Sequence, residues 1–238
     1  MVDERVALAA HNNADLYEAI FTAHGIPYER SSFAFVAGGR PPPFYSDITT
    51  LSPTATDEIL ARVEAMVERT GGRLAVKDAF DRLDLAALGF ELLFTAWWIW
   101  RPPTGDGPPP GWRPVESNDE LGAWEAAWKA SSPTDHYMFP AALLDDPAVT
   151  FWAGWRGDRI VAGCLANASG DCVGLSNVFA EGPTATLWAA AAAAAGSTVP
   201  RLPTVGYERG VDLAHAEAAG FAAVGSLRAF TAAAGDDH

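Results

Sequence analysis

A proline- and glycine-rich segment divides this chain near its middle. Residues 101–114 read Arg-Pro-Pro-Thr-Gly-Asp-Gly-Pro-Pro-Pro-Gly-Trp-Arg-Pro. Proline fixes the backbone φ angle and lacks an N–H, so this density of proline excludes a helix or a central strand. The 238 residues also exceed the roughly 100–200 of an average domain. We therefore predict domains at 1–101 and 115–231, a linker at 102–114 and a tail at 232–238.

The charge balance limits the partners that we expect. The chain has 16 basic and 30 acidic residues, for a formal net charge of −14. Such a chain lacks the excess of Lys and Arg with which nonspecific nucleic-acid binding neutralises phosphates. The same balance disfavours anionic membrane surfaces and is compatible with cationic substrates such as amines. We expect no nucleic-acid partner.

Signals for secretion, membrane insertion and metal binding are missing from the sequence. The longest apolar stretch, residues 85–100, is shorter than the ~20 residues of a spanning helix. The first ten residues include three charges and no apolar signal core. Cys164 and Cys172 are too few for a disulfide framework, and the five histidines lack ligand spacing. We expect a cytoplasmic protein with two ordinary buried thiols and no metal.

The two halves of the chain repeat each other weakly. Residues 45–56 parallel residues 175–186, and both segments end in Pro-Thr-Ala-Thr. Later in each half an Asp-Leu pair precedes a Gly-Phe pair, at Asp84-Leu85 with Gly89-Phe90 and at Asp212-Leu213 with Gly220-Phe221. Because the order of predicted elements around these pairs is also the same, we interpret the chain as an internal duplication.

Hydrophobic periodicity and helix boundary residues predict the secondary structure. In the first half we expect helices at 13–24, 56–70 and 80–88 and strands at 31–36, 45–51, 74–77 and 91–100. In the second half we expect strands at 112–115, 149–155, 159–167, 172–179, 203–207 and 222–230 and helices at 119–129, 140–144, 183–196 and 211–219. This order predicts an α/β (mixed α+β) fold in which helices flank a mixed sheet.

Three segments give the second half a resemblance to a known family. They are Gly174-Leu-Ser-Asn-Val-Phe179, Val205-Gly-Tyr-Glu208, and the stretch from Asp212-Leu to Ala219-Gly-Phe221. With the order of elements over most of residues 112–230, they resemble the GNAT superfamily of N-acetyltransferases. The first half resembles the C-terminal part of the same fold. The resemblance thus implies a tandem GNAT-like arrangement with a truncated first copy.

The resemblance implies a site for acetyl-CoA, the family's cofactor, beside the strand at 172–179. Asn177, Val178 and Phe179 would lie along the bound molecule, and its diphosphate would bind the loop that opens the next helix. In the family that loop reads Gln/Arg-x-x-Gly-x-Gly/Ala, whereas residues 180–187 here read Ala-Glu-Gly-Pro-Thr-Ala-Thr-Leu. Glutamate repels phosphate and proline lacks an N–H, so Gly182, Thr184 and Thr186 are the remaining candidates. The alternative is that this segment only begins a helix.

The candidates for catalysis are equally incomplete. Family members often carry a Tyr four residues before the Gly-Phe pair, where it can protonate the departing thiolate; here that position is Ala216. Tyr207 and Glu208, just after a strand, are candidates for substrate contact, although a surface turn would also explain them. His136 lies in an inter-helix loop of the kind that lines substrate sites in the family, or it is part of a plain polar loop. Trp98 and Trp100 share a strand face, which predicts a seam between domains or an aromatic substrate wall.

These observations lead to one leading hypothesis with alternatives. The first is an acetyl-CoA-dependent N-acetyltransferase of GNAT type that acts on an unknown small amine. The alternative is a catalytically silent GNAT-fold module that binds a protein or small ligand, because the diphosphate loop and the tyrosine are altered. A third is activity with a smaller acyl donor. The 9 Trp residues are compatible with a homodimer, and buried seams would explain them equally well.

Overall fold

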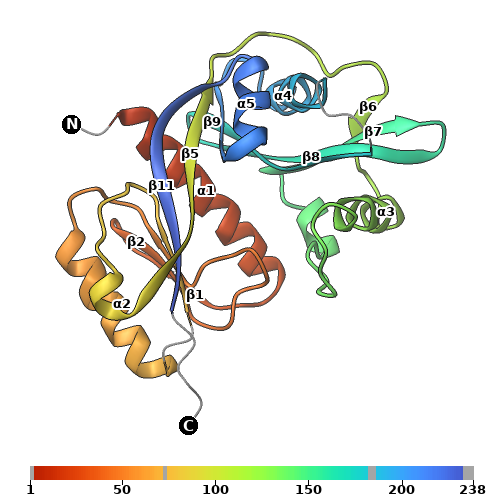
Figure 1. The fold of residues 1–238 in the computed structure, drawn as a ribbon. Helices are drawn as coiled ribbons and strands as arrows, with labels where there is room; N and C mark the ends of the chain where they lie inside the picture. Colours follow the sequence, from red (N-terminus) through yellow and green to blue (C-terminus); the bar gives the residue numbers. More distant parts are fainter. Residues whose placement is uncertain (1–2, 72–73, 182–185, 233–238) are drawn as a thin grey trace.

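The described residues of the chain form one mixed sheet with helices on both faces. The structure is a computed structural model that describes residues 3–71, 74–181 and 186–232. Its sheet has 11 strands in the order β1-β2-β3-β4-β11-β5-β10-β9-β8-β7-β6. Helix α1 crosses the middle of the molecule, α2 lies against the first half, and α3, α4 and α5 surround the second (Figure 1). This architecture confirms the predicted fold class.

The elements have the following bounds. The helices are α1 (Glu4–Ala23), α2 (Thr56–Thr70), α3 (Asn118–Lys129), α4 (Leu187–Thr198) and α5 (Gly210–Ala218), with short 3-10 turns η1 (Ala86–Leu88) and η2 (Ala141–Leu144). The first five strands are β1 (Tyr28–Arg30), β2 (Ala34–Ala37), β3 (Ile48–Thr50), β4 (Ala75–Asp78) and β5 (Phe90–Arg101). The others are β6 (Trp112–Pro114), β7 (Val149–Arg156), β8 (Arg159–Ser169), β9 (Cys172–Ala180), β10 (Thr204–Glu208) and β11 (Ala222–Ala232).

The last strand of each half pairs with the other half. Strand β5 lies between β11 and β10, and β11 lies between β4 and β5. Strand β11 pairs antiparallel with β4 through Arg228–Asp78 and Phe230–Val76, while β5 pairs antiparallel with β10 through Trp98–Tyr207. The two long strands run side by side through the centre of Figure 1. Each predicted domain therefore borrows a strand from the other, and the boundary between them stays a prediction.

Each half also contains one parallel strand pair. In the first half β3 and β4 pair through Ile48–Val76 and Thr49–Lys77, and in the second β9 and β10 pair through Val173–Thr204 and Gly174–Val205. The borrowed strand flanks the later member of each pair, as β11 beside β4 and β5 beside β10. This common arrangement supports the predicted duplication.

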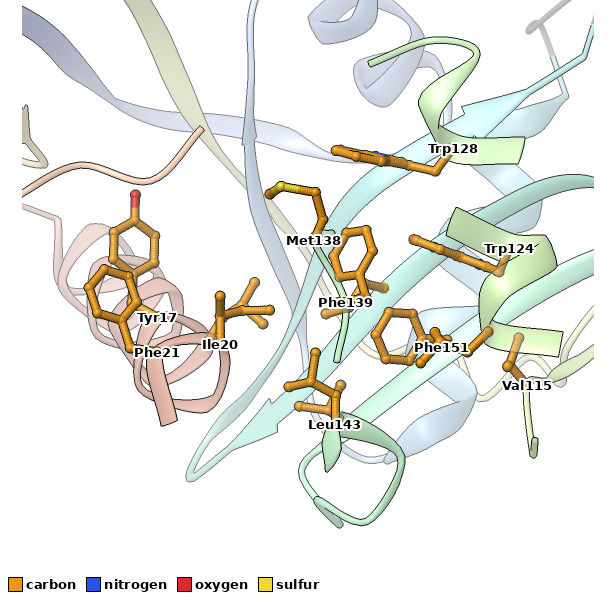
Figure 2. Packing of buried hydrophobic residues seen from close by; sticks show 14 of the residues in the cluster. Tyr17, Ile20, Phe21, Val115, Trp124, Trp128, Met138, Phe139, Leu143 and Phe151 are labelled. Carbon is orange, nitrogen blue, oxygen red and sulfur yellow. The ribbon is translucent and has the colours of Figure 1, made fainter. Parts of the chain in front are cut away.

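Aromatic side chains join the first helix to the second half. In the largest apolar cluster, Tyr17 and Phe21 of α1 share a core with Trp124 of α3 and Phe139. Trp124 and Phe139 meet edge to face with ring centroids 5.2 Å apart, a favourable geometry for aromatic pairs. Figure 2 shows Met138 and Phe139 between α1 on one side and Trp124 and Trp128 on the other. The opposite face of β7–β9 packs on the alanines of α4.

Four sequence predictions of local structure are wrong. Helix α1 begins at Glu4 instead of residue 13, because the Asp3 side chain accepts the Arg5 N–H and caps it. The helix expected at 80–88 is reduced to η1, because the carboxylate of Asp78 accepts three backbone N–H groups, from residues 80, 82 and 83. The strand expected at 31–36 is divided into a turn at 31–33 and the start of β2, which forms a hairpin with β1. Helix α4 begins at Leu187, after Pro183, and continues past Gly196 to Thr198.

Two other local predictions, a helix and the state of the cysteines, are confirmed. The helix expected at 56–70 has those bounds, and Gly71 ends it with φ of 67°, a left-handed conformation that glycine adopts readily. Cys164 and Cys172 are buried free thiols. Within the described ranges, no helix has both the length and the apolar character needed to cross a membrane. The same ranges contain no group of three or more His, Cys, Asp or Glu side chains arranged to hold a metal ion.

Candidate active site

The parallel pair β9–β10 opens into a wedge. The two strands are paired at Val173–Thr204 and Gly174–Val205, after which β9 continues to Ala180 without a β10 partner. A glycine is required where they part, because a Cβ atom on Gly206 would lie 2.6 Å from the carbonyl oxygen of Leu175. Backbone groups on the inner edge of a separated strand are available to a ligand.

A bulge in β9 sets the directions of its side chains. The pairing of β8 with β9 shifts register between Gly163–Phe179 and Leu165–Ser176, and Asn177 has a φ of 52°. Asn tolerates this left-handed conformation better than most residues. Of the predicted cofactor contacts, Asn177 lines the wedge, whereas Val178 packs on the cluster around α4 and Phe179 is part of the core against Trp124. Cofactor contact at Val178 and Phe179 therefore remains a prediction, and it would be made by the backbone of these residues.

The wedge contains a cavity whose walls come from both halves. Its volume is about 240 Å³. The second half supplies Leu175, Ser176, Asn177, Gly206, Tyr207, Glu208 and Arg209 from β9, β10 and the residue that follows. The first half supplies Asn12, Asn13 and Tyr17 from α1, Phe94 and Trp98 from β5, and Phe44 and Tyr45 from the loop before β3. The sequence placed the site within the second half and offered one residue of this opposite wall, Trp98, as part of an aromatic substrate wall; Trp100 does not line the cavity, and the other wall residues were missed.

Glu208 is the carboxylate that lines this cavity. Burial is the larger cause and repulsion from Asp212 the smaller one that raise the pKa of the Glu208 carboxyl to about 8. The backbone N–H and the charge of Arg209 act in the opposite direction. A carboxyl group with a pKa near the working pH is suited to accept a proton in general-base catalysis. The structure thus places a predicted residue where it can act as a base.

Tyr207 lies above a buried lysine. The Nζ atom of Lys77 is 4.6 Å from the Tyr207 ring centroid and 4.8 Å from that of Tyr17, a cation–π arrangement on two sides. The same nitrogen donates to Asn13 Oδ1 at 2.9 Å and to the Tyr207 hydroxyl at 3.4 Å. The pKa of the Tyr17 phenol is raised by burial and lowered by the Lys77 charge, and the net direction is downward. This arrangement holds the Tyr207 ring in place against the cavity.

An asparagine pair anchors α1 to the wedge floor. Asn12 Nδ2 donates to the carbonyl of Asn167 at 3.0 Å, and Asn167 Nδ2 returns a bond to the carbonyl of Asn12 at 2.9 Å. Gly174 leaves room for the pair, since a Cβ there would lie 2.2 Å from both side-chain oxygens. Both asparagines are buried, so the paired amides satisfy polar groups that would otherwise be costly.

The other predicted site residues are not gathered at this cavity. His136 is exposed and lines a separate depression with Arg40 and Asp47, so the structure does not bring it to Tyr207 or Glu208. Thr186 occupies the position before α4, exposed to solvent, and its hydroxyl caps no N–H group of the described residues. Gly182 and Thr184 lie outside the described residues. Ala216 is buried on α5, where the family's tyrosine would stand.

Comparisons with known proteins identify the fold. No protein-family model matches the chain, and no curated protein matches its sequence. A GCN5-related N-acetyltransferase from Kribbella flavida matches with a TM-score of 0.63 and 13% identity over 95% of this chain and 96% of that chain. A GNAT-family acetyltransferase structure from Novosphingobium aromaticivorans matches at 0.56 and 12%, over 90% and 95%. A functionally unknown protein from Staphylococcus epidermidis matches at 0.56 and 9%, over 86% and 92%.

These likenesses extend over both halves of the chain. The described structure has the fold of the GNAT N-acetyltransferases, which confirms the predicted resemblance. At such low identity the likeness concerns the fold, and fold alone does not fix an activity.

Proposed function

We propose that the chain is an N-acetyltransferase of GNAT type that transfers an acetyl group from acetyl-CoA to a small amine in the β9–β10 wedge. The observation that carries the proposal is the open wedge with Glu208, of pKa about 8, on its wall. An amine must lose a proton as its nitrogen forms the amide bond, and Glu208 would accept that proton. Acetyl-CoA, when bound, supplies the acetyl group as an activated thioester.

The described residues fit part of such a donor. The inner edge of β9 at Ser176 and Asn177 would hold its extended arm, and Thr186 at the start of α4 would face its diphosphate. The predicted repulsion from Glu181 is reduced, since Arg159 Nη1 of β8 donates to the Glu181 carboxylate. Tyr207, held over Lys77, is the tyrosine that could return a proton in place of the one missing at Ala216.

Matched substitutions at two helix starts test the proposal. A glutamate in place of Thr186 is favourable to α4 through the helix dipole, worth ~0.3–1 kcal/mol, but repels a diphosphate. Thr56 is the corresponding residue of the repeat and begins α2. We expect Thr186→Glu to weaken acetyl-CoA binding at least about tenfold, and Thr56→Glu to leave it unchanged. Calorimetric titration with acetyl-CoA and desulfo-CoA, checked by thermal unfolding, measures both.

Two outcomes would favour the alternatives. If millimolar acetyl-CoA fails to raise the unfolding temperature of the unsubstituted chain, the donor does not bind, because a bound ligand stabilises by mass action. That result supports the silent binding module. If S-acetylpantetheine, which lacks the nucleotide, supports transfer as well as acetyl-CoA does, the smaller acyl donor is favoured.

A further inference from the structure

A second concave region adjoins the wedge. We call it the Arg40 cleft; it is formed by the loop 37–43, Tyr45, Asp47, the end of α2 and His136, and its volume is about 680 Å³. Tyr45 lines both this cleft and the wedge cavity. Phe44, which lies between Tyr45 and the cleft loop in the sequence, lines the wedge. A molecule that occupies the wedge could therefore extend past Tyr45 into the cleft.

Basic side chains from three separate segments line this cleft. Arg40 comes from the loop between β2 and β3, Arg69 from the last turn of α2, and His136 from the loop between α3 and η2. Neither guanidinium has a hydrogen bond or an ion pair with any residue in the described ranges. In contrast Arg30, Arg113 and Arg228 each pair with carboxylates. Both arginines are exposed, so both guanidiniums are available to a ligand in the cleft.

The acid of the cleft, Asp47, forms no ion pair with either arginine. Asp47 is the one carboxylate among the lining residues that the structure describes. Its Oδ2 atom accepts the N–H of Ala75 at 2.7 Å. Burial raises the pKa of the Asp47 carboxyl against its backbone hydrogen bonds and the nearby Arg40 charge. The Asp47 side chain is thus hydrogen-bonded to the backbone of β4, and the two arginines keep their capacity for bidentate binding of an anion.

The loop that carries Arg40 is stiff and holds an aromatic side chain at the wedge mouth. It contains Pro41, Pro42 and Pro43, which restrict the backbone. Phe44 follows with a φ of 72° and is 63% exposed, with its ring centroid 5.8 Å from that of Trp128. A left-handed Phe is unfavourable and persists where the surroundings impose it, often beside a ligand site. The loop therefore fixes the position of Phe44 on the wall of the wedge, next to the cleft loop.

We propose that the Arg40 cleft binds an anionic group of the acceptor, so that the acceptor is an amine that also carries a carboxylate or a phosphate. The inference rests on the proposed function, because it assumes that the amine lies at Glu208. The amine end would meet the carboxylate and aromatic walls of the wedge, and the acidic end would meet Arg40 and Arg69. Both charges of the acceptor would then be matched by the protein.

Binding of matched small amines tests this without acetyl transfer. Calorimetric titration would compare 6-aminohexanoate with hexylamine, and O-phosphoethanolamine with ethanolamine. We expect the anionic member of at least one pair to bind about tenfold or more tightly, and the better pair distinguishes carboxylate from phosphate. Arg40→Ala and Arg69→Ala should remove this preference. Arg201→Ala should keep it, since Arg201 is another exposed arginine without an ion pair to the described residues and lies outside the cleft.

The outcomes separate this inference from the proposed function. Equal binding within both pairs overturns the cleft proposal, as does a preference that survives Arg40→Ala and Arg69→Ala. If hexylamine is acetylated as efficiently as 6-aminohexanoate and O-phosphoethanolamine, the transferase stands and the cleft proposal fails. If the anionic amines bind through Arg40 and Arg69 but no acetyl-CoA binds, the cleft is supported as an anion site and the transferase fails. Protection of Arg40 and Arg69 from phenylglyoxal by inorganic phosphate, read by peptide mass, would support the site independently.

Discussion

Both parallel strand pairs of this molecule have a borrowed strand beside their later member, but only one of the two pairs is open. In the second half β9 and β10 separate after Gly174 and Val205, and a cavity lies between them. In the first half β3 and β4 remain paired at Ile48–Val76 and Thr49–Lys77. By the sequence repeat, Ile48 corresponds to Val178 of β9, which lies well beyond the point where the second pair has parted. The first pair is therefore closed where the second is open.

Local side chains explain the closure of the first pair. The Thr50 hydroxyl accepts the Ala79 N–H at 2.8 Å, so contact continues to the end of β3. The Trp98 indole then donates to the Ala79 carbonyl at 2.7 Å and fills the space beyond β4. Because β5 is the borrowed strand, Trp98 also contacts Tyr207 and lines the open wedge. One side chain thus helps to close one pair and to form a wall of the other.

The two halves therefore contribute to the wedge in different ways. The closed pair leaves no comparable strand edge for a donor in the described first half, and its residues instead form a wall of the wedge. The predicted duplication would then have kept one site and converted the other copy into part of the acceptor side. That history remains a prediction, supported by the matching order of parallel pairs and borrowed strands.

The largest expected effect comes from removal of Trp98. It is 1% exposed, and a buried Trp→Ala change typically destabilises by about 3–5 kcal/mol through lost packing and the cavity left behind. Trp98→Ala should lower the free energy of unfolding by that amount, as measured by urea denaturation. Trp97→Ala, at a neighbouring position that is 43% exposed, is the matched control and should have a much smaller effect. Similar losses at both positions would show that Trp98 does not hold the two pairs together.

The second-largest expected effect comes from substitution of Glu208, the proposed general base on the wall of the open pair. Loss of a general base typically slows a reaction by roughly a hundredfold or more, about 2.7 kcal/mol in activation free energy. The wild-type rate should rise with pH through about 8 as Glu208 loses its proton, and Glu208→Gln should abolish this rise. Asp212→Asn should shift the profile to lower pH, because Asp212 raises the pKa of Glu208. Glu217→Gln, on an exposed position of α5, is the control.

The same carboxyl predicts a pH dependence of stability. Its folded-state pKa of about 8 lies above the ordinary value of 4.5, so the folded state holds a proton that the unfolded state has lost between these values. Stability should therefore fall as the pH rises from about 4.5 to 8. Relative to wild type, Glu208→Gln should become more stable over this window. A constant difference between the two unfolding curves would contradict the burial of Glu208 as the cause.

The sequence predicted those parts of the site that lie along one strand. Apolar runs and boundary residues predicted β9 and β10, and with them Tyr207, Glu208 and Asn177. The sequence could not predict that Lys77 belongs to the site. The contact of Lys77 with Tyr207 joins residues 130 positions apart and depends on the exchange of β5 and β11 between the halves. Nothing local marks Lys77 as buried, since a lysine at a strand end ordinarily reaches solvent. Likewise, the pattern at 80–88 favours a helix until the Asp78 carboxylate takes three of its N–H groups.

The smallest expected effect tests the closure of the first pair itself. Thr50→Val keeps the shape of the side chain but removes the acceptor for the buried Ala79 N–H, and an unsatisfied buried donor typically destabilises by ~1–3 kcal/mol. We expect a loss within this range and smaller than that of Trp98→Ala, because one hydrogen bond is lost and no cavity is left. Amide hydrogen exchange at Ala79 should accelerate, while exchange along β9 stays the same. Thr54→Val, at an exposed position before α2, should change neither quantity. If Thr50→Val leaves both stability and exchange at Ala79 unaltered, the hydroxyl does not keep β3 and β4 together, and their closure must come from the backbone pairing and Trp98.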